Sequence, residues 1–171
     1  MKITKKTVLV LGVSSLAVIV LVCTWFFDPF SQISINRRSF KKAVLSLSDD
    51  IKEVAFDDLA SFDWDYVYSF DPYISEEEIN NILGFNSGID LKTMDENTEN
   101  LIFVNDNEVI CYIAGFSGKL KFAFDLGEIN NRHVKISKSD QPIFFMKVSD
   151  DGTKYFSFDG TFRYWHKIFL D

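Results

Sequence analysis

The sequence predicts an α+β domain with a mostly antiparallel sheet and two short helices, joined to an N-terminal transmembrane helix. Three observations predict this class. An uncharged apolar run comes first, a helix with strong end signals follows in the first half of the domain, and hairpin signals fill the second half. The 171 residues are enough for one ordinary domain and an appendage.

The apolar run covers residues 7–27 and contains no charged residue. As a helix it would be about 31 Å long, which matches the roughly 30 Å hydrocarbon core of a bilayer. We therefore expect a single-pass anchor, with the lipid bilayer as its partner. A cleaved signal peptide is one alternative, although the run is long for it. A lipoprotein signal ending at Cys23 is the other, although Val22 stands where that signal needs Gly, Ala or Ser.

The flanking charges predict the orientation of the anchor. Three lysines precede it, and positive charge favours the cytoplasmic side. Residues 1–6 are therefore predicted to be a cytoplasmic tail, residues 28–35 a linker, and residues 36–171 an extracytoplasmic domain. Four basic residues soon after the anchor count against this orientation, or they rest on anionic headgroups. They are Arg37, Arg38, Lys41 and Lys42.

The composition of residues 28–171 limits the partners of the domain. This part contains all 25 acidic residues and 15 of the 18 basic ones, so its formal charge is −10. Such a surface repels nucleic acid and suits a soluble domain or a basic partner. Cys111 is its only cysteine, so no disulfide is expected. Sixteen phenylalanines predict an aromatic-rich core.

The domain is expected to begin with a helix over residues 36–47, because Phe40, Val44 and Leu47 share one face. This basic amphipathic helix packs either on the sheet of its own domain or on the membrane surface. A strand near residues 51–56 comes next.

A second strand is predicted up to Phe70, because four aromatic residues alternate with smaller or polar ones. We expect all four to face inward: Trp64, Tyr66, Tyr68 and Phe70. Pro72 ends the strand because it lacks an amide hydrogen.

A short helix over residues 76–83 has signals at both ends. Ser75 and Glu78 form a predicted capping box, and Ile74 and Ile79 are placed for a hydrophobic staple. Gly84 occupies the position of a left-handed C-cap.

The remaining residues predict a loop and then strands. Residues 86–100 are polar and indicate a surface loop. Strands over 101–104 and 108–116 flank a short turn and form a hairpin. Further strands are expected over four ranges: 119–126, 133–137, 142–148 and 154–158.

No motif indicates catalysis, a cofactor or a metal ion. The sequence lacks the HExxH and EF-hand patterns, and the glycines at 115–118 form neither a nucleophile elbow nor a phosphate loop. Cys111 is expected to be a buried, inert thiol. A hydrolase that pairs Asp63 or Asp65 with His133 or His166 is a remaining hypothesis, and it requires the paired groups to share one cleft.

The stretch from Trp64 to Tyr73, followed by the helix ending at Leu83–Gly84, has the pattern W-D-x-x-Y-x-F-x-P-Y. It resembles a pattern of small, uncharacterised bacterial proteins that begin with a signal or membrane anchor. The similarity covers residues 62–113. It implies an exported, sheet-containing domain of bacterial origin, and it implies no activity.

These observations favour a membrane-anchored protein with a non-catalytic binding or interaction domain and an unidentified protein partner. The alternative is an immunity-type or inhibitor protein whose acidic surface neutralises a basic partner. Aromatic and arginine side chains are frequent anchors of interfaces. The candidate interaction residues are Trp64, Asp65, Tyr73, Arg163 and Trp165.

Overall fold

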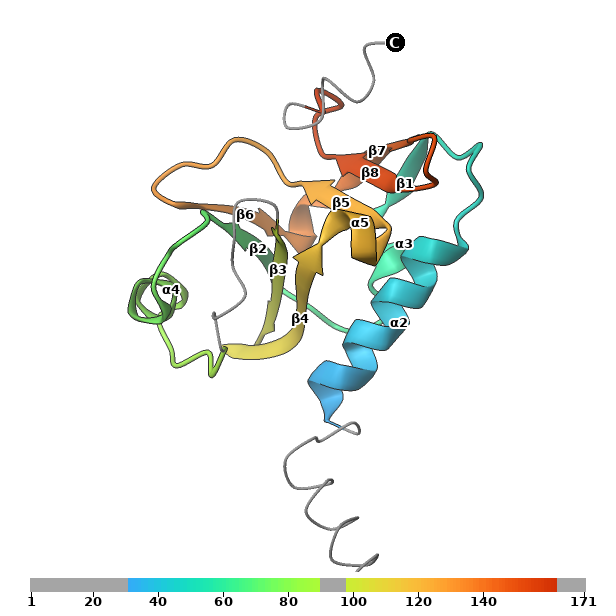
Figure 1. Cartoon of the computed structure of the whole chain (residues 1–171). Coiled ribbons are helices and arrows are strands. Elements are labelled where there is room, and N and C mark those ends of the chain that lie inside the picture. Colours follow the sequence, from blue (N-terminus) through green and yellow to red (C-terminus); the bar gives the residue numbers. More distant parts are fainter. Residues whose placement is uncertain (1–30, 90–97, 163–171) are drawn as a thin grey trace, which may run out of the picture.

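The computed structural model describes residues 31–89 and 98–162 (Figure 1). It confirms an α+β domain with mostly antiparallel strands. In chain order the elements are α2 (Gln32–Ser46), β1 (Glu53–Ala55), α3 (Phe56–Leu59), β2 (Tyr66–Phe70), α4 (Glu76–Leu83), β3 (Thr98–Asn105), β4 (Glu108–Phe116), α5 (Ser117–Leu120), β5 (Phe122–Asp125), β6 (His133–Ser137), η1 (Lys138–Asp140), β7 (Ile143–Val148) and β8 (Lys154–Ser157).

The strands form two sheets of four strands each. The first sheet has the order β1-β7-β8-β5, and the second has the order β4-β3-β2-β6. Neighbouring strands are antiparallel except for β5 and β8, which are parallel. The single sheet predicted from the sequence is therefore divided, with α2 packed along β4 (Figure 1).

An aromatic core fills the space between the two sheets and α2. Phe40 from α2, Phe103 from β3 and Phe124 from β5 are all part of it. The ring of Phe56 lies at its centre, stacked 5.5 Å from the ring of Phe103 and tilted against that of Phe144 at 5.0 Å. The phenylalanine-rich composition thus serves to join the two sheets.

The outer face of the second sheet carries a smaller core beneath α4. Tyr68 and Phe70 belong to it, together with Ile79 of α4. Trp64 instead lies in the main core, as does Val67. The prediction that the alternating aromatic residues share one inward face was therefore wrong for Trp64. The alternation begins only with β2 at Tyr66, and both faces of this sheet are covered.

Helix α4 confirms the predicted boundaries at both ends. The Ser75 hydroxyl accepts a hydrogen bond from the Glu78 amide, and the Glu78 carboxylate accepts one from the Ser75 amide. Gly84 adopts a left-handed conformation with φ of 81° at the C-cap. Because these capping interactions are local, the sequence alone predicts where this helix begins and ends.

Two other helices differ from the prediction. Helix α2 begins at Gln32, inside the predicted linker, because Ser31 caps the amide of Ser34. The segment predicted as one strand over 119–126 divides into α5 and β5. Lys121 separates them with φ of 63°, and its amide closes the helical turn on Ser117. Two further short helices, α3 and η1, were not predicted.

Asn100 lies inside β3, although the sequence indicated a loop that extends to this residue. Its side chain is buried and hydrogen-bonds the backbone of Phe70, beyond the last residue pair of the β2–β3 ladder, Tyr68 with Ile102. The Asn100 Oδ1 accepts a hydrogen bond from the Phe70 amide at 2.6 Å, and the Nδ2 donates one to the Phe70 carbonyl at 3.0 Å.

We expect Asn100→Ala to lower the free energy of unfolding by about 1–3 kcal/mol, because it leaves a buried amide and a buried carbonyl without these partners. Denaturant unfolding of the full chain in detergent, followed by near-ultraviolet circular dichroism, measures this loss. The exposed Asn130→Ala is the matched control, with an expected change within about 0.5 kcal/mol. Equal losses in the two variants would contradict the bridging role of Asn100.

Within residues 31–89 and 98–162, no helix has the length and apolar character needed to cross a membrane. The predicted tail and anchor at residues 1–27 lie outside these ranges, as does the segment from Arg163 to the C-terminus.

Candidate functional site

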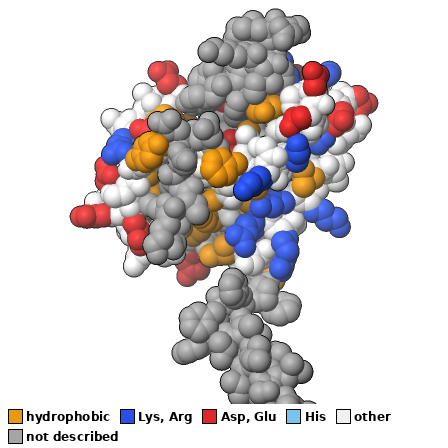
Figure 2. Space-filling view, viewed as in Figure 1, with side chains coloured by type: hydrophobic (Ala, Val, Ile, Leu, Met, Phe, Trp, Pro, Cys, Tyr) orange, Lys and Arg blue, Asp and Glu red, His pale blue; other side chains and the backbone are white. Residues whose placement is uncertain are grey.

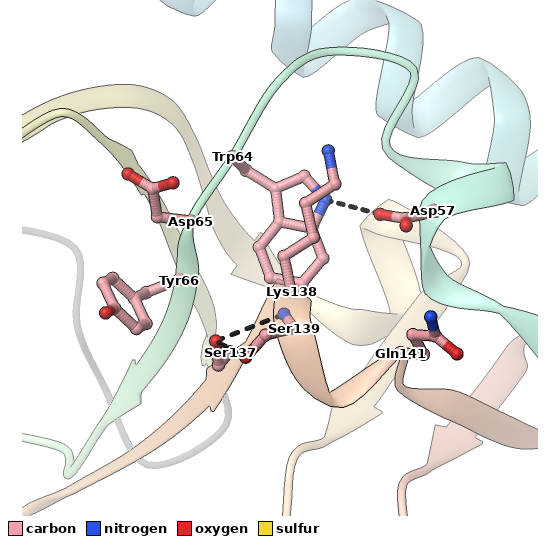
Figure 3. A pocket seen from close by; sticks show the side chains of 8 residues that line it. All are labelled: Asp57, Trp64, Asp65, Tyr66, Ser137, Lys138, Ser139 and Gln141. Atoms are coloured by element: carbon pink, nitrogen blue, oxygen red, sulfur yellow. Dashed lines mark hydrogen bonds between the residues drawn. The ribbon is translucent and has the colours of Figure 1, made fainter.

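A polar cleft of about 540 Å³ opens beside the start of β2 (Figure 3). Asp65 and Tyr66 lie on one side of it, and Asp57 and Gln141 lie on the other (Figure 3). The described residues that line the cleft are Asp57, Trp64, Asp65, Tyr66, Ser137, Lys138, Ser139 and Gln141. The cleft therefore combines the stretch that the sequence singled out with the unpredicted turn η1.

Trp64 anchors the cleft to the core. It is 1% exposed, and its ring meets Phe56 edge-to-face at 5.4 Å. Its indole Nε1 donates a hydrogen bond of 2.9 Å to Asp57 Oδ1 (Figure 3). A buried indole N–H needs such a partner, so this bond fixes the Asp57 carboxylate at the wall of the cleft.

Asp65 holds the other wall by backbone and side-chain bonds. Its amide donates to the Val104 carbonyl at 2.8 Å, and its carbonyl accepts from the Lys138 amide at 2.9 Å. Its Oδ2 accepts a hydrogen bond of 2.9 Å from the amide of Asp106. Asp106 and Asn107 form the turn between β3 and β4, with φ of 49° and 61°. Asp65 thus fastens this hairpin turn to the start of β2.

The turn after β6 supplies the hydroxyl and amide groups of the cleft. The Ser137 hydroxyl caps the amide of Ser139, and the Asp140 carboxylate accepts from the Ser137 amide. Gln141 then adopts a left-handed conformation with φ of 48°. The Ser137 and Asp140 spacing is a capping signal that sequence analysis could have used to find this turn.

Two lysines place positive charge at the rim. Lys138 Nζ lies 3.7 Å from Asp63 Oδ1, and this exposed pair contributes little to stability. Lys135 Nζ lies 3.5 Å from the centre of the Tyr66 ring, a cation–π contact. Carboxylates, hydroxyls, an amide and an ammonium group therefore surround the same opening.

The predicted interaction residues do not form one site. Trp64 and Asp65 line the cleft, although Trp64 is almost fully covered. Tyr73 follows the opposite end of β2, where it is 66% exposed and has φ of 64°. Arg163 and Trp165 lie outside the described residues.

The geometry gives no support to the hydrolase hypothesis for His133. In the β2–β6 ladder Tyr66 pairs with Ser137, while Phe70 pairs with His133. Four strand residues separate the two ends by about 13 Å, so His133 and Asp65 do not share the cleft. His166, the other candidate, lies outside the described residues.

Two further observations concern chemistry elsewhere in the domain. Cys111 is fully buried, as predicted, and burial raises the pKa of its thiol to about 12, which disfavours the reactive thiolate. Among the residues that the structure describes, no three His, Cys, Asp or Glu side chains are grouped to hold a metal ion.

Comparisons of the chain with protein-family models, with curated proteins and with solved structures gave no match.

Proposed function

We propose that this chain is a single-pass membrane protein whose extracytoplasmic domain binds another protein through the polar cleft, without catalysing a reaction. Support for the anchor comes from the uncharged run at residues 7–27 and its flanking charges. The resemblance of residues 62–113 to small exported bacterial proteins points in the same direction. Support for binding comes from the cleft.

The composition of the cleft is the observation that carries the proposal. Among the residues that the structure describes, those that line the cleft include no histidine or cysteine. Its lysine, Lys138, lies next to Asp63, and the two serine hydroxyls lie 2.8 Å from each other. Within residues 31–89 and 98–162, neither serine of the cleft is thus paired with a base in the way that nucleophilic catalysis requires. What remains is a fixed set of hydrogen-bonding groups, which suits recognition.

The groups in the cleft also indicate the chemistry of the partner. Asp57 and Asp65 offer acceptors, whereas Lys138 and Gln141 offer donors. A peptide segment presents one N–H donor and one C=O acceptor at nearly every residue, so it can satisfy both kinds of group at once. Tyr66 adds an aromatic surface at the rim, as is common at protein interfaces. We therefore assign the cleft to a loop or terminus of a protein partner.

A second candidate function is neutralisation of a basic protein by an acidic surface. The α2–β1 loop and the β7–β8 turn lie together, because Lys154 of β8 pairs with Asp49. Three further acidic residues occur there: Asp50, Asp150 and Asp151. Acidic side chains are frequent at this end of the molecule in Figure 2. Hydrogen bonds from Ser149, an ion pair with Lys121 and bonds from Thr153 hold the pKa of Asp151 below its usual range.

Photo-crosslinking in cells that naturally produce the chain separates the two functions. A benzophenone amino acid at Gln141 reports on the cleft, and the same group at Asp150 reports on the acidic end. We expect a discrete crosslinked protein from position 141, and we expect Lys138→Glu to reduce its yield at least fivefold by reversing the charge at the rim. Lys52→Glu, an exposed change elsewhere, is the control and should leave the yield unchanged.

Crosslinking from position 150 alone would favour the acidic-surface function. No crosslinked protein from position 141, or a yield that is insensitive to Lys138→Glu, would contradict the cleft as the binding site.

A further inference from the structure

The 15-residue helix α2 has two unlike faces along its length. Asn36, Phe40 and Val44 are buried against the domain. On the opposite side, Ile35 is 42% exposed and Leu45 is 47% exposed. A helix turns about 100° per residue, so Arg38 and Lys42 lie between these two apolar residues on the same outward stripe. We name Ile35, Arg38, Lys42 and Leu45 the outer face.

The charge of α2 is opposite to that of the domain. Residues 32–46 contain four basic residues and no acidic residue, whereas residues 28–171 have a formal charge of −10. Lys and Arg side chains gather over α2 in Figure 2. Burial, and then the charge of Arg37, lower the pKa of the neighbouring Lys41. A helix that carries four basic side chains and no acidic one has the charge that suits contact with an external anionic surface.

The position of α2 in the chain suggests which surface this is. The predicted anchor ends at Phe27 and the helix begins at Gln32. These five steps span at most about 17 Å even when fully extended. The N-terminal end of α2 is also an extremity of the described domain (Figure 1). The first turns of the helix are thus held near the bilayer by the chain itself.

We propose that the outer face of α2 rests on the anionic headgroups of the bilayer that holds the anchor, with Arg38 and Lys42 as the contacting cations and Ile35 inserted between lipids. This inference rests on the membrane anchor of the proposed function, and it adds an orientation of the domain on the membrane. Asp49 and Asp50 follow the helix and are repelled by such a surface. The helix is therefore tilted, with its first three turns making the contact and Leu45 farther away.

The expected strength of the contact is moderate. Each basic side chain close to an anionic membrane favours binding by roughly fivefold, so Arg38 and Lys42 together raise the docking equilibrium constant by roughly 25-fold. The anchor makes this an intramolecular equilibrium, which increases occupancy without further contacts. Salt at high concentration weakens the contact, because the Debye length falls to about 3 Å at 1 M.

The test uses the full chain in nanodiscs of phosphatidylcholine, with or without 30% phosphatidylglycerol. A fluorophore is attached to Ile35→Cys in a Cys23→Ser background, where the buried Cys111 does not react. Lipids with a nitroxide headgroup quench the fluorophore when it reaches the membrane. We expect strong quenching in the anionic discs only, and its loss in 1 M salt. A fluorophore at Asp150→Cys should be unaffected by the lipid composition.

Charge reversal identifies the residues responsible. Arg38→Glu with Lys42→Glu should lower the docked fraction at least tenfold. Lys52→Glu with Lys147→Glu changes the net charge equally at exposed positions outside α2 and should have no effect. Equal quenching in neutral and anionic discs, or an equal response to both pairs, would overturn the proposal. Quenching that depends on the number of chains per disc would assign the face to a second copy and would also overturn it.

The same experiment distinguishes failure of the membrane anchor from failure of the α2 contact. A chain that does not co-purify with the discs would contradict the proposed function, whereas a chain that enters the discs without quenching at position 35 would contradict the α2 contact alone.

Discussion

Replacing Phe56 by alanine is expected to lower the free energy of unfolding by about 3–5 kcal/mol, the usual range for a phenylalanine in a closed core. Phe56 is fully buried at the start of α3. Its ring contacts aromatic rings from α2, from the start of β2 and from both sheets. The neighbours belong to different elements that cannot all move inward together, so we expect the cavity to persist.

Amide hydrogen exchange of the full chain in detergent measures this effect element by element. Because Phe56 joins both sheets, protection should fall in β3 and in β7 together. Phe116→Ala is the matched control, since this ring is 44% exposed and its loss should cost about 1 kcal/mol or less. Loss of protection in one sheet only would show that the sheets are stabilised independently and would contradict a common core.

Replacing Glu99 by glutamine is expected to stabilise the protein increasingly as the pH rises. The Glu99 carboxylate points from β3 toward β5, where its Oε2 accepts a hydrogen bond of 3.0 Å from the Phe124 amide. Burial raises the pKa of Glu99 to about 8, the Phe124 amide opposes this shift, and the charge of Asp125 adds to it. Glutamine keeps an acceptor for the amide without requiring a charge at this partly buried position.

The sign of this pH dependence follows from the difference in bound protons between the folded and unfolded protein. Between the ordinary pKa of 4.5 and the folded value of about 8, the folded protein holds a proton that the unfolded chain has lost. The wild-type free energy of unfolding therefore falls as the pH rises through this window, by up to about 1.4 kcal/mol per pH unit from this group. The advantage of Glu99→Gln should grow at that rate from pH 5 and level off above pH 8.

Denaturant unfolding at several pH values measures the difference between Glu99→Gln and the wild type. Glu108→Gln, at an exposed position of β4, is the control and should show no such growth. A difference between Glu99→Gln and the wild type that is constant from pH 5 to 8 would mean that Glu99 is already ionised in the folded protein.

Elements with local causes were predictable. Helix α4 depends on a capping box and a C-cap glycine within ten residues, and its predicted ends are those observed. The β3–β4 hairpin depends on a two-residue turn, and β6 on a short alternating run. In each case the stabilising groups are neighbours in sequence, so one sequence contains the necessary information.

Elements that depend on distant partners were not predictable. The division into two sheets is set by strand pairings such as β1 with β7, between residues that are about ninety positions apart. Asn100 is a residue type that is common in loops, but its side chain hydrogen-bonds both the amide and the carbonyl of Phe70 in the neighbouring strand. A local sequence pattern does not show which faces of a strand other elements will cover. The alternation therefore predicted one face for Trp64, Tyr68 and Phe70, although Trp64 lies in the main core and the other two lie in the smaller one.

The candidate site also combines features that depend on neighbours in sequence with features that depend on distant residues. The sequence by itself determined an uncharged apolar run over residues 7–27, an acidic and phenylalanine-rich composition after it, and the ends of α4. It gave no reason for Asp65. The tertiary structure decided that reason, because the Asp65 carboxylate accepts the amide of Asp106 and its carbonyl accepts that of Lys138. These partners are 41 and 73 positions away, and only folding brings their amides to one carboxylate and one carbonyl.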